Sequence, residues 1–375
     1  IMVITGGPGT GKTTLIRAII TAAEQNGLEP ALMAPTGRAA KRLAISSGRD
    51  ADTIHKALEA SVRETGRTYF ERNEANPLEE DLIIVDEASM LDISLFYHLL
   101  CALKDGARLI LVGDIDQLPP VGAGEPLKDL MSWGYVPIVR LKRIFRQEEG
   151  SGIVENAALI RKGEMCVPDE AGEFRIVYAA DDEDAYRIVM DLCRELNYGN
   201  EENKMLLQVL SPMYRGVCGV DHLNESLQEM IHGEKVPDGM KFFPGDKVMQ
   251  TRNDYEKGIY NGDVGTVWTA TPQKVFVRYF DKEVVYEGEE RFDLRLAYAV
   301  TVHKSQGSEY ETVIFILRPS QHNMLQRNLL YTGVTRARKN TILVTAPDAL
   351  RRALAIQHTG NRYSLFLPFL NHEAL

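Results

Sequence analysis

A glycine-rich loop near the start of the chain constrains the fold more than any other feature. The segment Gly6–Thr13, "GGPGTGKT", matches the pattern GxxxxGK[ST]; the strand-like "MVIT" precedes it and the helical "TTLIRAIITAA" follows it. In such a loop the glycines let backbone N–H groups turn inward around phosphates, while the lysine reaches the terminal phosphates and the threonine ligates Mg²⁺. The sequence therefore predicts a strand–loop–helix unit that binds a nucleotide through Gly7, Gly9, Thr10, Gly11, Lys12, Thr13 and Thr14.

Short apolar strands alternate with helical patterns along the rest of the chain. "MVIT", "ALMAP", "LIIVD" and "LILVGD" each run into a polar or glycine-rich turn, which is typical of a parallel sheet with functional groups at the carboxyl ends of its strands. From about Phe145 the pattern repeats in "FRIVYA", "LLQVLSP", "AYAVTVH", "TVIFIL" and "TILVTA", without a second phosphate loop. We predict an α/β protein of two domains, 1–144 and 145–375, with the nucleotide at their interface.

Two insertions interrupt this alternation. The segment Ala60–Pro77 has β-prone flanks around a Thr-Gly turn, which predicts a hairpin over Val62–Arg72. The segment Lys235–Arg291 contains closely spaced short strands with Gly-Asp and Asn-Gly turns, which predicts a small β-barrel.

Composition excludes several classes of protein. The 43 Lys and Arg residues against 53 Asp and Glu give a net charge of −10, which argues against a uniformly basic nucleic-acid binder but permits a local basic groove. The four cysteines are far apart and form no CxxC pair, so neither a zinc site nor a disulfide framework is indicated, and a reducing cytoplasm fits best. No apolar run approaches the ~18 residues of a membrane helix.

Three polar residues follow predicted strands of the first domain. Asp86, at the end of "LIIVD", can hold the Mg²⁺ shell, and Glu87 beside it can orient a water for attack on the γ-phosphate. Gln117, in "VGDIDQLPP", follows the next strand, where its amide can sense the γ-phosphate. The alternative is a set of solvated polar residues at strand ends.

Eight segments in order carry a resemblance over nearly the whole chain. They are "GGPGTGKTT", "APTGRAAKRL", "TIHKAL", "VDEASMLD", "GDIDQLPPVGAG", "IFRQEEGSGIVENAALIRKGE", "AYAVTVHKSQGSEY" and "LLYTGVTRARKNTILV". This set resembles the motifs of superfamily 1 helicases and, within them, the RecD-like branch of 5′→3′ DNA helicases, to which the exodeoxyribonuclease V α-subunit belongs. The resemblance implies two RecA-like domains, with a hairpin pin inserted in the first and an SH3-like barrel in the second.

The resemblance also implies roles for residues of the second domain. Arg146 of "FRQ" and Arg336 of "VTRAR" resemble the arginines that reach the γ-phosphate, with Arg338 as the competing candidate and surface ion pairing as the alternative for each. Glu309 resembles the residue that meets the ribose, and Gln306 and Gly307 are expected along the same nucleotide site.

A second group of residues is expected to hold a nucleic-acid strand. Hydroxyls, N–H donors and rings of this kind grip a single strand without reading its sequence; the group comprises Thr36, Arg38, Thr53, His55, Thr301 and His303. The alternatives are that Thr36 caps the helix of "GRAAKRL" and that His55 is an ordinary helix histidine.

The resulting hypothesis is an ATP- and Mg²⁺-dependent 5′→3′ DNA helicase and single-strand translocase. Its expected partners are single-stranded DNA, forks between single and double strands, and other repair or recombination subunits, with no membrane. The alternatives are an RNA helicase of the same superfamily and a non-motor ATP-binding subunit of a recombination complex. The adenine-reading glutamine motif of superfamily 1 helicases lies upstream of the phosphate loop, so the sequence predicts no base preference.

Overall fold

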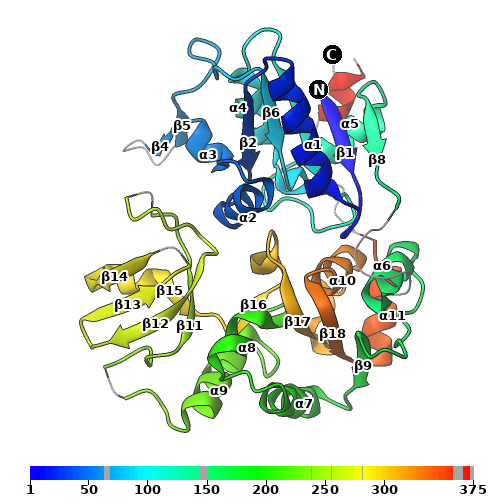
Figure 1. Cartoon of the computed structure of the whole chain (residues 1–375). Helices are drawn as coiled ribbons and strands as arrows, with labels where there is room; N and C mark the ends of the chain where they lie inside the picture. The colour runs from blue at the N-terminus through cyan, green and yellow to red at the C-terminus, as the bar shows by residue number, and fades with distance from the viewer. Residues whose placement is uncertain are drawn as a thin grey trace. The chain divides into compact units, whose positions relative to one another are not determined.

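The computed structural model describes residues 1–62, 68–143, 151–237, 239–254, 256–280, 282–357 and 366–371 (Figure 1). The chain divides into two compact units: unit 1 is Ile1–Glu148 with Gly360–Leu375, and unit 2 is Glu149–Thr359. Each unit contains a parallel sheet flanked by helices, which confirms the predicted α/β class.

Unit 1 is built on a six-stranded parallel sheet in the order β3-β2-β6-β7-β1-β8. Its four longest strands are those predicted from the apolar runs, and β6 is buried along its whole length because helices cover both faces of the sheet. The strands are β1 (Met2–Thr5), β2 (Pro30–Ala34), β3 (Asp52–Thr53), β6 (Leu82–Val85), β7 (Arg108–Gly113) and β8 (Ile138–Arg140). The helices are α1 (Lys12–Gln25), α2 (Gly37–Ser47), α3 (Ile54–Ala57), η1 (Ala88–Met90), α4 (Ile93–Cys101) and α5 (Pro126–Trp133).

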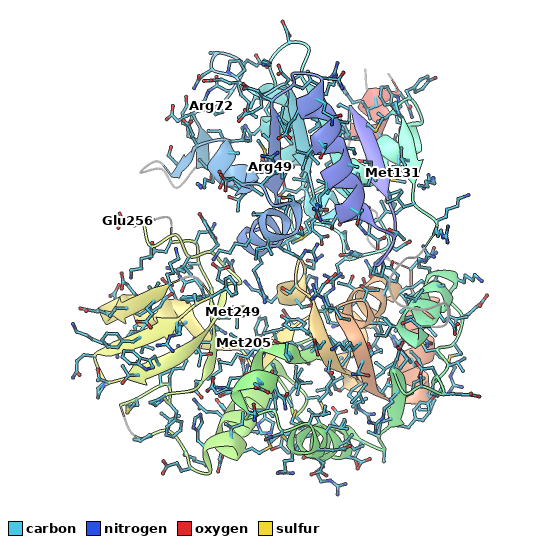
Figure 2. The ribbon with its side chains drawn as sticks, in the orientation of Figure 1. Arg49, Arg72, Met131, Met205, Met249 and Glu256 are labelled. Carbon is cyan, nitrogen blue, oxygen red and sulfur yellow. The ribbon has the colours of Figure 1, made fainter. Side chains whose placement is uncertain are left out.

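The last described helix, α12 (Phe366–Leu370), packs on α5 and joins the core of unit 1 that contains Met131 (Figures 1 and 2). The Phe366 ring meets the buried Phe96 ring edge-on at 5.8 Å. The sequence predicts this segment in the second domain, 145–375, whereas the structure assigns it to unit 1. An apolar terminal segment joins whichever core it reaches, and its sequence position does not reveal which one.

The predicted hairpin is present in unit 1 as β4 (Ala60–Val62) and β5 (Thr68–Phe70). The two strands pair antiparallel, with Ala60 opposite Phe70, and the predicted tip, 63–67, lies outside the described residues. At the base, Arg72 donates to Glu59 at 2.9 Å (Figure 2). Phe70 is buried in the core of unit 1, with its ring 4.5 Å from the His98 ring, so one of the two aromatics of this arm packs on its own unit.

Unit 2 contains a five-stranded parallel sheet in the order β16-β10-β17-β18-β9. Its strands are β9 (Phe174–Tyr178), β10 (Leu207–Ser211), β16 (Ala299–Thr301), β17 (Tyr310–Leu317) and β18 (Ala337–Thr345), which correspond to the five apolar runs of the second half. The helices are α6 (Gly152–Lys162), α7 (Asp182–Glu195), α8 (Glu201–Leu206), α9 (Val220–His232), η3 (His303–Ser305), η4 (Pro319–Met324), α10 (Arg327–Val334) and α11 (Pro347–Ala355).

The predicted barrel insertion is an antiparallel five-stranded sheet in the order β14-β13-β12-β11-β15 (Figure 1). Its strands are β11 (Lys247–Gln250), β12 (Val264–Ala270), β13 (Lys274–Arg278), β14 (Glu283–Glu287) and β15 (Leu294–Leu296), with η2 (Gly288–Asp293) before the last strand. The sheet extends beyond Arg291, the predicted limit, because β15 pairs with β11 and forms one edge of the sheet.

Two buried charged residues attach the barrel to the rest of unit 2. Lys247 donates to Leu207 O and to Gln208 Oε1, both at 3.0 Å, and Asp246 accepts from the Tyr298 hydroxyl at 2.9 Å. Buried charges are tolerated only when hydrogen-bonded in this way, so the first barrel strand is held against β10 and β16. No helix in the described part of the chain has the length and apolar character needed to cross a membrane.

Candidate nucleotide and nucleic-acid sites

The phosphate loop joins β1 to α1 in the predicted conformation. Gly9 and Gly11 have φ angles of 71° and 81°, a left-handed region that disfavours any residue with a Cβ. A Cβ on Gly6 would lie 2.6 Å from Thr10 Oγ1, so this position also requires glycine. The Thr10 hydroxyl donates to Gly7 O at 2.8 Å and closes the loop from within.

Lys12 folds back over this loop. Its Nζ donates to Gly6 O at 2.7 Å and to Gly7 O at 2.9 Å, which holds the ammonium above the concave side. The helix begins after Gly11, which has no side chain to cap it, and the first turn contains no acidic residue. The loop therefore combines a lysine with the positive end of a helix, the arrangement that binds phosphate groups.

An acidic pair stands at the end of β6. Asp86 and Glu87 are only 4% and 5% exposed, and Asp86 Oδ1 accepts from the Glu87 backbone N–H at 2.9 Å. Burial, with the neighbouring Glu87 charge, raises the pKa of Asp86 to about 6, against the smaller opposing effect of Arg42. Glu87 has a φ of 52°, a conformation of non-glycine residues that is concentrated at functional sites.

Arg42 completes this cluster from α2. Its Nη2 donates to Glu87 Oε1 at 2.7 Å and lies 3.9 Å from Asp86 Oδ2. Arg42 is not predictable from the sequence as a site residue, because its one signal is a basic residue in the helix after a neighbouring strand. Only the packing of α2 on β2, the strand next to β6, brings its guanidinium to the two carboxylates.

Gln117 lies just after β7, as predicted, and its side chain is buried. Its Oε1 and the Ser89 Oγ are both buried without a hydrogen-bond partner among the described residues, and both residues line a cavity of about 20 Å³. A buried acceptor without a partner is uncommon in folded proteins. The Gln117 amide oxygen therefore remains able to accept a hydrogen bond, and it follows β7, the neighbour of strand β6, which Asp86 and Glu87 follow.

The predicted strand-binding threonines of unit 1 cap helices. Thr36 Oγ1 accepts from Ala39 N at 3.3 Å and Thr53 Oγ1 accepts from Lys56 N at 3.1 Å, so the capping alternative for Thr36 is confirmed. A hydroxyl that accepts in a cap keeps its own proton for donation to a phosphate, so capping and strand binding are compatible. Burial lowers the pKa of His55, with a smaller opposing effect of Asp92, which favours a neutral ring. Arg38 is half-buried.

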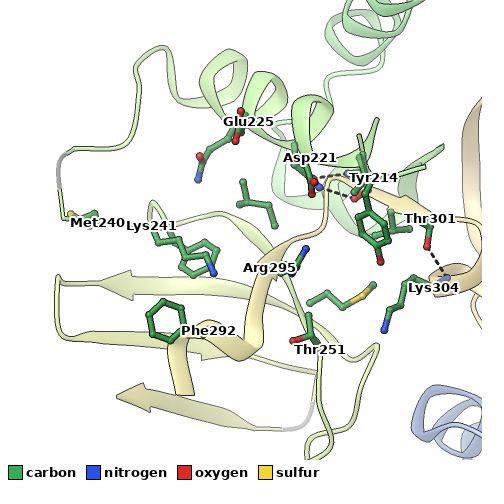
Figure 3. A pocket seen from close by; sticks show the side chains of 18 residues that line it. Tyr214, Asp221, Glu225, Met240, Lys241, Thr251, Phe292, Arg295, Thr301 and Lys304 are labelled. Atoms are coloured by element: carbon green, nitrogen blue, oxygen red, sulfur yellow. Dashed lines mark hydrogen bonds between the residues drawn. The ribbon is translucent and has the colours of Figure 1, made fainter. Parts of the chain in front are cut away.

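The predicted strand-binding residues of unit 2 lie in η3 or next to it. Thr301 is buried and its Oγ1 accepts from Lys304 N at 3.3 Å (Figure 3), while His303 is half-buried. Gly307 has a φ of 73°, and the buried Gln306 precedes it. Glu309 accepts from Arg338 Nε at 2.9 Å.

The candidate arginines differ in their surroundings. Arg336 is 3% exposed; its Nε donates to Thr332 O at 3.2 Å and its Nη1 to Ser308 O at 3.1 Å. Arg338 is on the surface and pairs with Glu309. Arg338 therefore fits the alternative of ion pairing at the surface, whereas Arg336 is held by hydrogen bonds to backbone carbonyls. Arg146 lies outside the described residues.

Comparison with known proteins identifies the family. Three family models match: an AAA domain over 1–123, an ATP-dependent RecD-like DNA helicase SH3 domain over 223–279, and a UvrD-like helicase C-terminal domain over 296–344. The RecBCD enzyme subunit RecD of Mycolicibacterium smegmatis is 34% identical over 97% of this chain and 72% of its own length. The chain belongs to the RecD-like helicase family.

Other members and solved structures agree with this assignment. The ATP-dependent RecD2 DNA helicase of Deinococcus radiodurans is 39% identical to this RecD-like chain, which spans half of that relative's length. The Pif1 helicase from Bacteroides in complex with ADP-AlF3 and ssDNA has a TM-score of 0.58 at 21% identity, over 99% of this chain and 92% of its own. The Pif1 helicase from Candida albicans has a TM-score of 0.58 at 20% identity, over 99% and 95%. These structures confirm the fold.

Proposed function

We propose that this RecD-like chain is the motor core of an ATP-dependent 5′→3′ DNA helicase and single-strand translocase. The observation that carries the proposal is the buried Asp86–Glu87–Arg42 cluster at the strand end beside a complete phosphate loop. A protein that only bound nucleotide would not need a second, buried carboxylate held by an arginine. The names of the relatives, an ATP-dependent DNA helicase and RecBCD subunits, support DNA as the track and recombination or repair subunits as partners.

The donor set fits Mg²⁺ and ATP. Thr13 supplies a hydroxyl and Asp86 a carboxylate, which are the hard oxygen ligands that Mg²⁺ prefers. Because burial raises the pKa of Asp86 to about 6, a cation beside it would favour the ionised form that ligation needs. When bound, Mg²⁺ and ATP supply the transferable phosphoryl group and the charge that offsets its oxygens.

The chain's own residues then have separate tasks. Lys12, already held above the loop, neutralises the terminal phosphates, and the backbone N–H groups of the loop fix their position. Glu87 orients the attacking water and takes its proton, while Arg42 holds the Glu87 carboxylate in place. Gln117 offers its buried amide to the γ-phosphate, and Arg336 is the proposed arginine of unit 2, with Glu309 at the ribose.

The proposed strand track uses the threonine, histidine and arginine side chains identified in both units. Their hydroxyl and N–H groups suit phosphate oxygens, and sequence-independent contacts are what a translocating motor requires. A reducing cytoplasm is the proposed location, supported by four cysteines that are all free thiols.

The first test replaces Glu87 by Gln. This change keeps an oxygen for Arg42 and removes the charge that activates water, so we expect ATP affinity within about twofold of wild type and a fall in kcat of roughly 10²–10⁴-fold. Nucleotide binding is measured by fluorescence titration and turnover by phosphate release. A matching loss of ATP affinity would show that Glu87 is structural.

The second test measures strand displacement on duplexes with either a 5′ or a 3′ single-stranded tail. Unwinding that needs ATP and the 5′ tail supports the proposal, and a preference for the 3′ tail contradicts it. A further comparison measures how strongly single-stranded DNA and single-stranded RNA stimulate ATP hydrolysis. Stronger stimulation by DNA contradicts the RNA helicase alternative, and stronger stimulation by RNA supports it. Hydrolysis that neither strand stimulates would favour the non-motor ATP-binding subunit.

A further inference from the structure

Two buried side chains of unit 1, Ser89 and Gln117, line the same small cavity of about 20 Å³. Ser89 is 8% exposed and Gln117 is 7% exposed. Neither Ser89 Oγ nor Gln117 Oε1 has a hydrogen-bond partner within the part of the chain that the structure describes. A buried polar atom without a partner costs free energy, so two of them at one cavity indicate that something else satisfies them.

The backbone beside the cavity is held in place. At Gly113, the last residue of β7, a Cβ would lie 2.9 Å from Ser89 N, so this glycine lets β7 lie directly against η1. Gln117 N donates to Asp114 O at 3.3 Å, and Asp114 Oδ1 accepts from Asp116 N at 3.1 Å. The backbone that carries Ser89 and Gln117 is therefore fixed, whereas the orientation of the Gln117 amide is not fixed by these contacts.

The cavity has the size and lining of a site for one water molecule. A buried water needs roughly 10–15 Å³ or more and about two to four polar partners. This cavity offers about 20 Å³ and the two unpartnered oxygens, and Glu125 also lines it. Leucine and proline residues form much of the remaining wall: Leu91, Leu118, Leu127, Pro119 and Pro120. A water bound there would therefore be held mainly by the Ser89 and Gln117 oxygens.

The two ends of the Gln117 amide are not equivalent for the proposed reaction. The oxygens of an ionised phosphate accept hydrogen bonds and donate none, so Gln117 can meet the γ-phosphate only through its Nε2–H groups. A donor that reaches Oε1 inside the cavity fixes the amide with Nε2 directed away from it. Water supplies such a donor, because it can accept from the Ser89 hydroxyl and donate to Gln117 Oε1 at the same time.

We propose that the cavity binds one water molecule, which accepts a hydrogen bond from Ser89 Oγ and donates one to Gln117 Oε1. Ser89 is then a positioning residue: it touches neither the nucleotide nor Mg²⁺, and it acts through the water on the Gln117 amide. The water joins the segment that follows Asp86 and Glu87 to the loop that follows β7. The proposal rests on the proposed function, in which Gln117 meets the γ-phosphate.

Ser89→Ala tests this role by removing the hydroxyl. The water is then held more weakly and the Gln117 amide populates both orientations, so we expect kcat for ATP hydrolysis to fall roughly fivefold to tenfold. The Kd for ATP should stay within about twofold of wild type, because the phosphate loop is unchanged. Phosphate release measures kcat, and fluorescence titration measures Kd. Thermal melting should give the wild-type midpoint or a higher one, because the hydroxyl has no partner to lose among the described residues.

A double-mutant cycle separates positioning from a structural effect. Gln117→Ala should lower kcat by more than Ser89→Ala does. Adding Ser89→Ala to the Gln117→Ala protein should have no further effect on kcat, because the amide that the water orients is gone. Ser132→Ala is the matched control and should keep the wild-type kcat: Ser132 lies on α5 outside the cavity, and its exposed hydroxyl donates to Lys128 O at 2.9 Å.

A crystal structure that resolves ordered waters tests the site directly. We expect density for one water within hydrogen-bond distance of both Ser89 Oγ and Gln117 Oε1, and we expect Ser89→Ala to weaken or remove it. A direct hydrogen bond between the two side chains, or a dry cavity, would overturn the proposal.

The kinetic outcomes distinguish the failure of this proposal from the failure of the proposed function. If the wild type hydrolyses ATP and Ser89→Ala behaves like Ser132→Ala, the positioning role is overturned while the proposed function stands. The same holds if the effects of Ser89→Ala and Gln117→Ala multiply in the double variant. If Gln117→Ala keeps the wild-type kcat, the roles of Gln117 and Ser89 are both overturned. If the wild type hydrolyses no ATP, the proposed function is overturned with them.

Discussion

The ionised Asp86 carboxylate should destabilise the folded protein at neutral pH, although the proposed reaction needs it as a Mg²⁺ ligand. Its pKa is raised from 3.8 to about 6, first by burial and then by Glu87. A carboxyl whose folded pKa is above its unfolded pKa costs stability as pH rises from the lower value to the higher, and the full cost remains above the higher value. At about 1.36 kcal/mol per pKa unit, that cost is roughly 3 kcal/mol at about pH 8 and roughly 1 kcal/mol at about pH 4.5.

Asp86→Asn removes the ionisable group and keeps an oxygen that can accept from the Glu87 N–H. We expect the variant to be more stable than wild type by up to about 3 kcal/mol at about pH 8, with the gain shrinking by about 2 kcal/mol at about pH 4.5. Urea unfolding of both proteins, without nucleotide or Mg²⁺, measures the two differences. The same variant should lose most ATP hydrolysis, because the Mg²⁺ ligand is replaced.

Asp81→Asn serves as the opposite control. Hydrogen bonds from Lys104 and the Glu29 N–H lower the pKa of this half-buried carboxyl, so its removal should destabilise slightly at about pH 8. The reasoning on Asp86 is refuted if Asp86→Asn is less stable than wild type at about pH 8. It is also refuted if the gain is equal at the two pH values, since a gain from relieved ionisation must fall as the carboxyl becomes protonated.

The remaining predictions concern the loop, the arginines and the hairpin. Lys12→Ala should abolish ATP hydrolysis while single-strand binding in anisotropy assays persists; near-normal turnover would contradict the role of the loop. Arg336→Ala should lower kcat by roughly 10³-fold with little change in ATP affinity, and it should lower the unfolding midpoint because two buried carbonyls lose their donor. If ATP affinity falls instead and kcat holds, Arg336 is a binding clamp and Arg338 becomes the candidate. The hairpin is proposed as the pin that keeps the separated strands apart at a fork. Replacing 62–68 by a Gly-Ser linker, which keeps the buried Phe70, should therefore abolish duplex displacement from a 5′ tail but leave DNA-stimulated hydrolysis; unwinding at the parent rate per ATP would show that the hairpin only packs on unit 1.

Residues of the site were predictable from the sequence where they follow a strand closely along the chain. Lys12, Asp86 and Gln117 each lie within or after a loop at the carboxyl end of a parallel strand, and such ends meet at one edge of the sheet. Arg42 was not predictable in this way, because its contact depends on how a helix packs on its neighbouring strand. The same holds for the cavity between Ser89 and Gln117, whose walls come from η1, the loop after β7 and α5.

The sequence by itself determined the local elements: the two sets of parallel strands, the phosphate loop, the hairpin and the barrel. Periodicity, glycine positions and ordered motifs are local properties, so they can be read along the chain. Tertiary structure alone decided that α12 completes the core of unit 1, that Phe70 packs rather than projects, and that Arg336 is buried among carbonyls. The burial of a side chain and its hydrogen-bond partners depend on residues that are distant in sequence. Folding brings these residues together, and no local sequence pattern connects them.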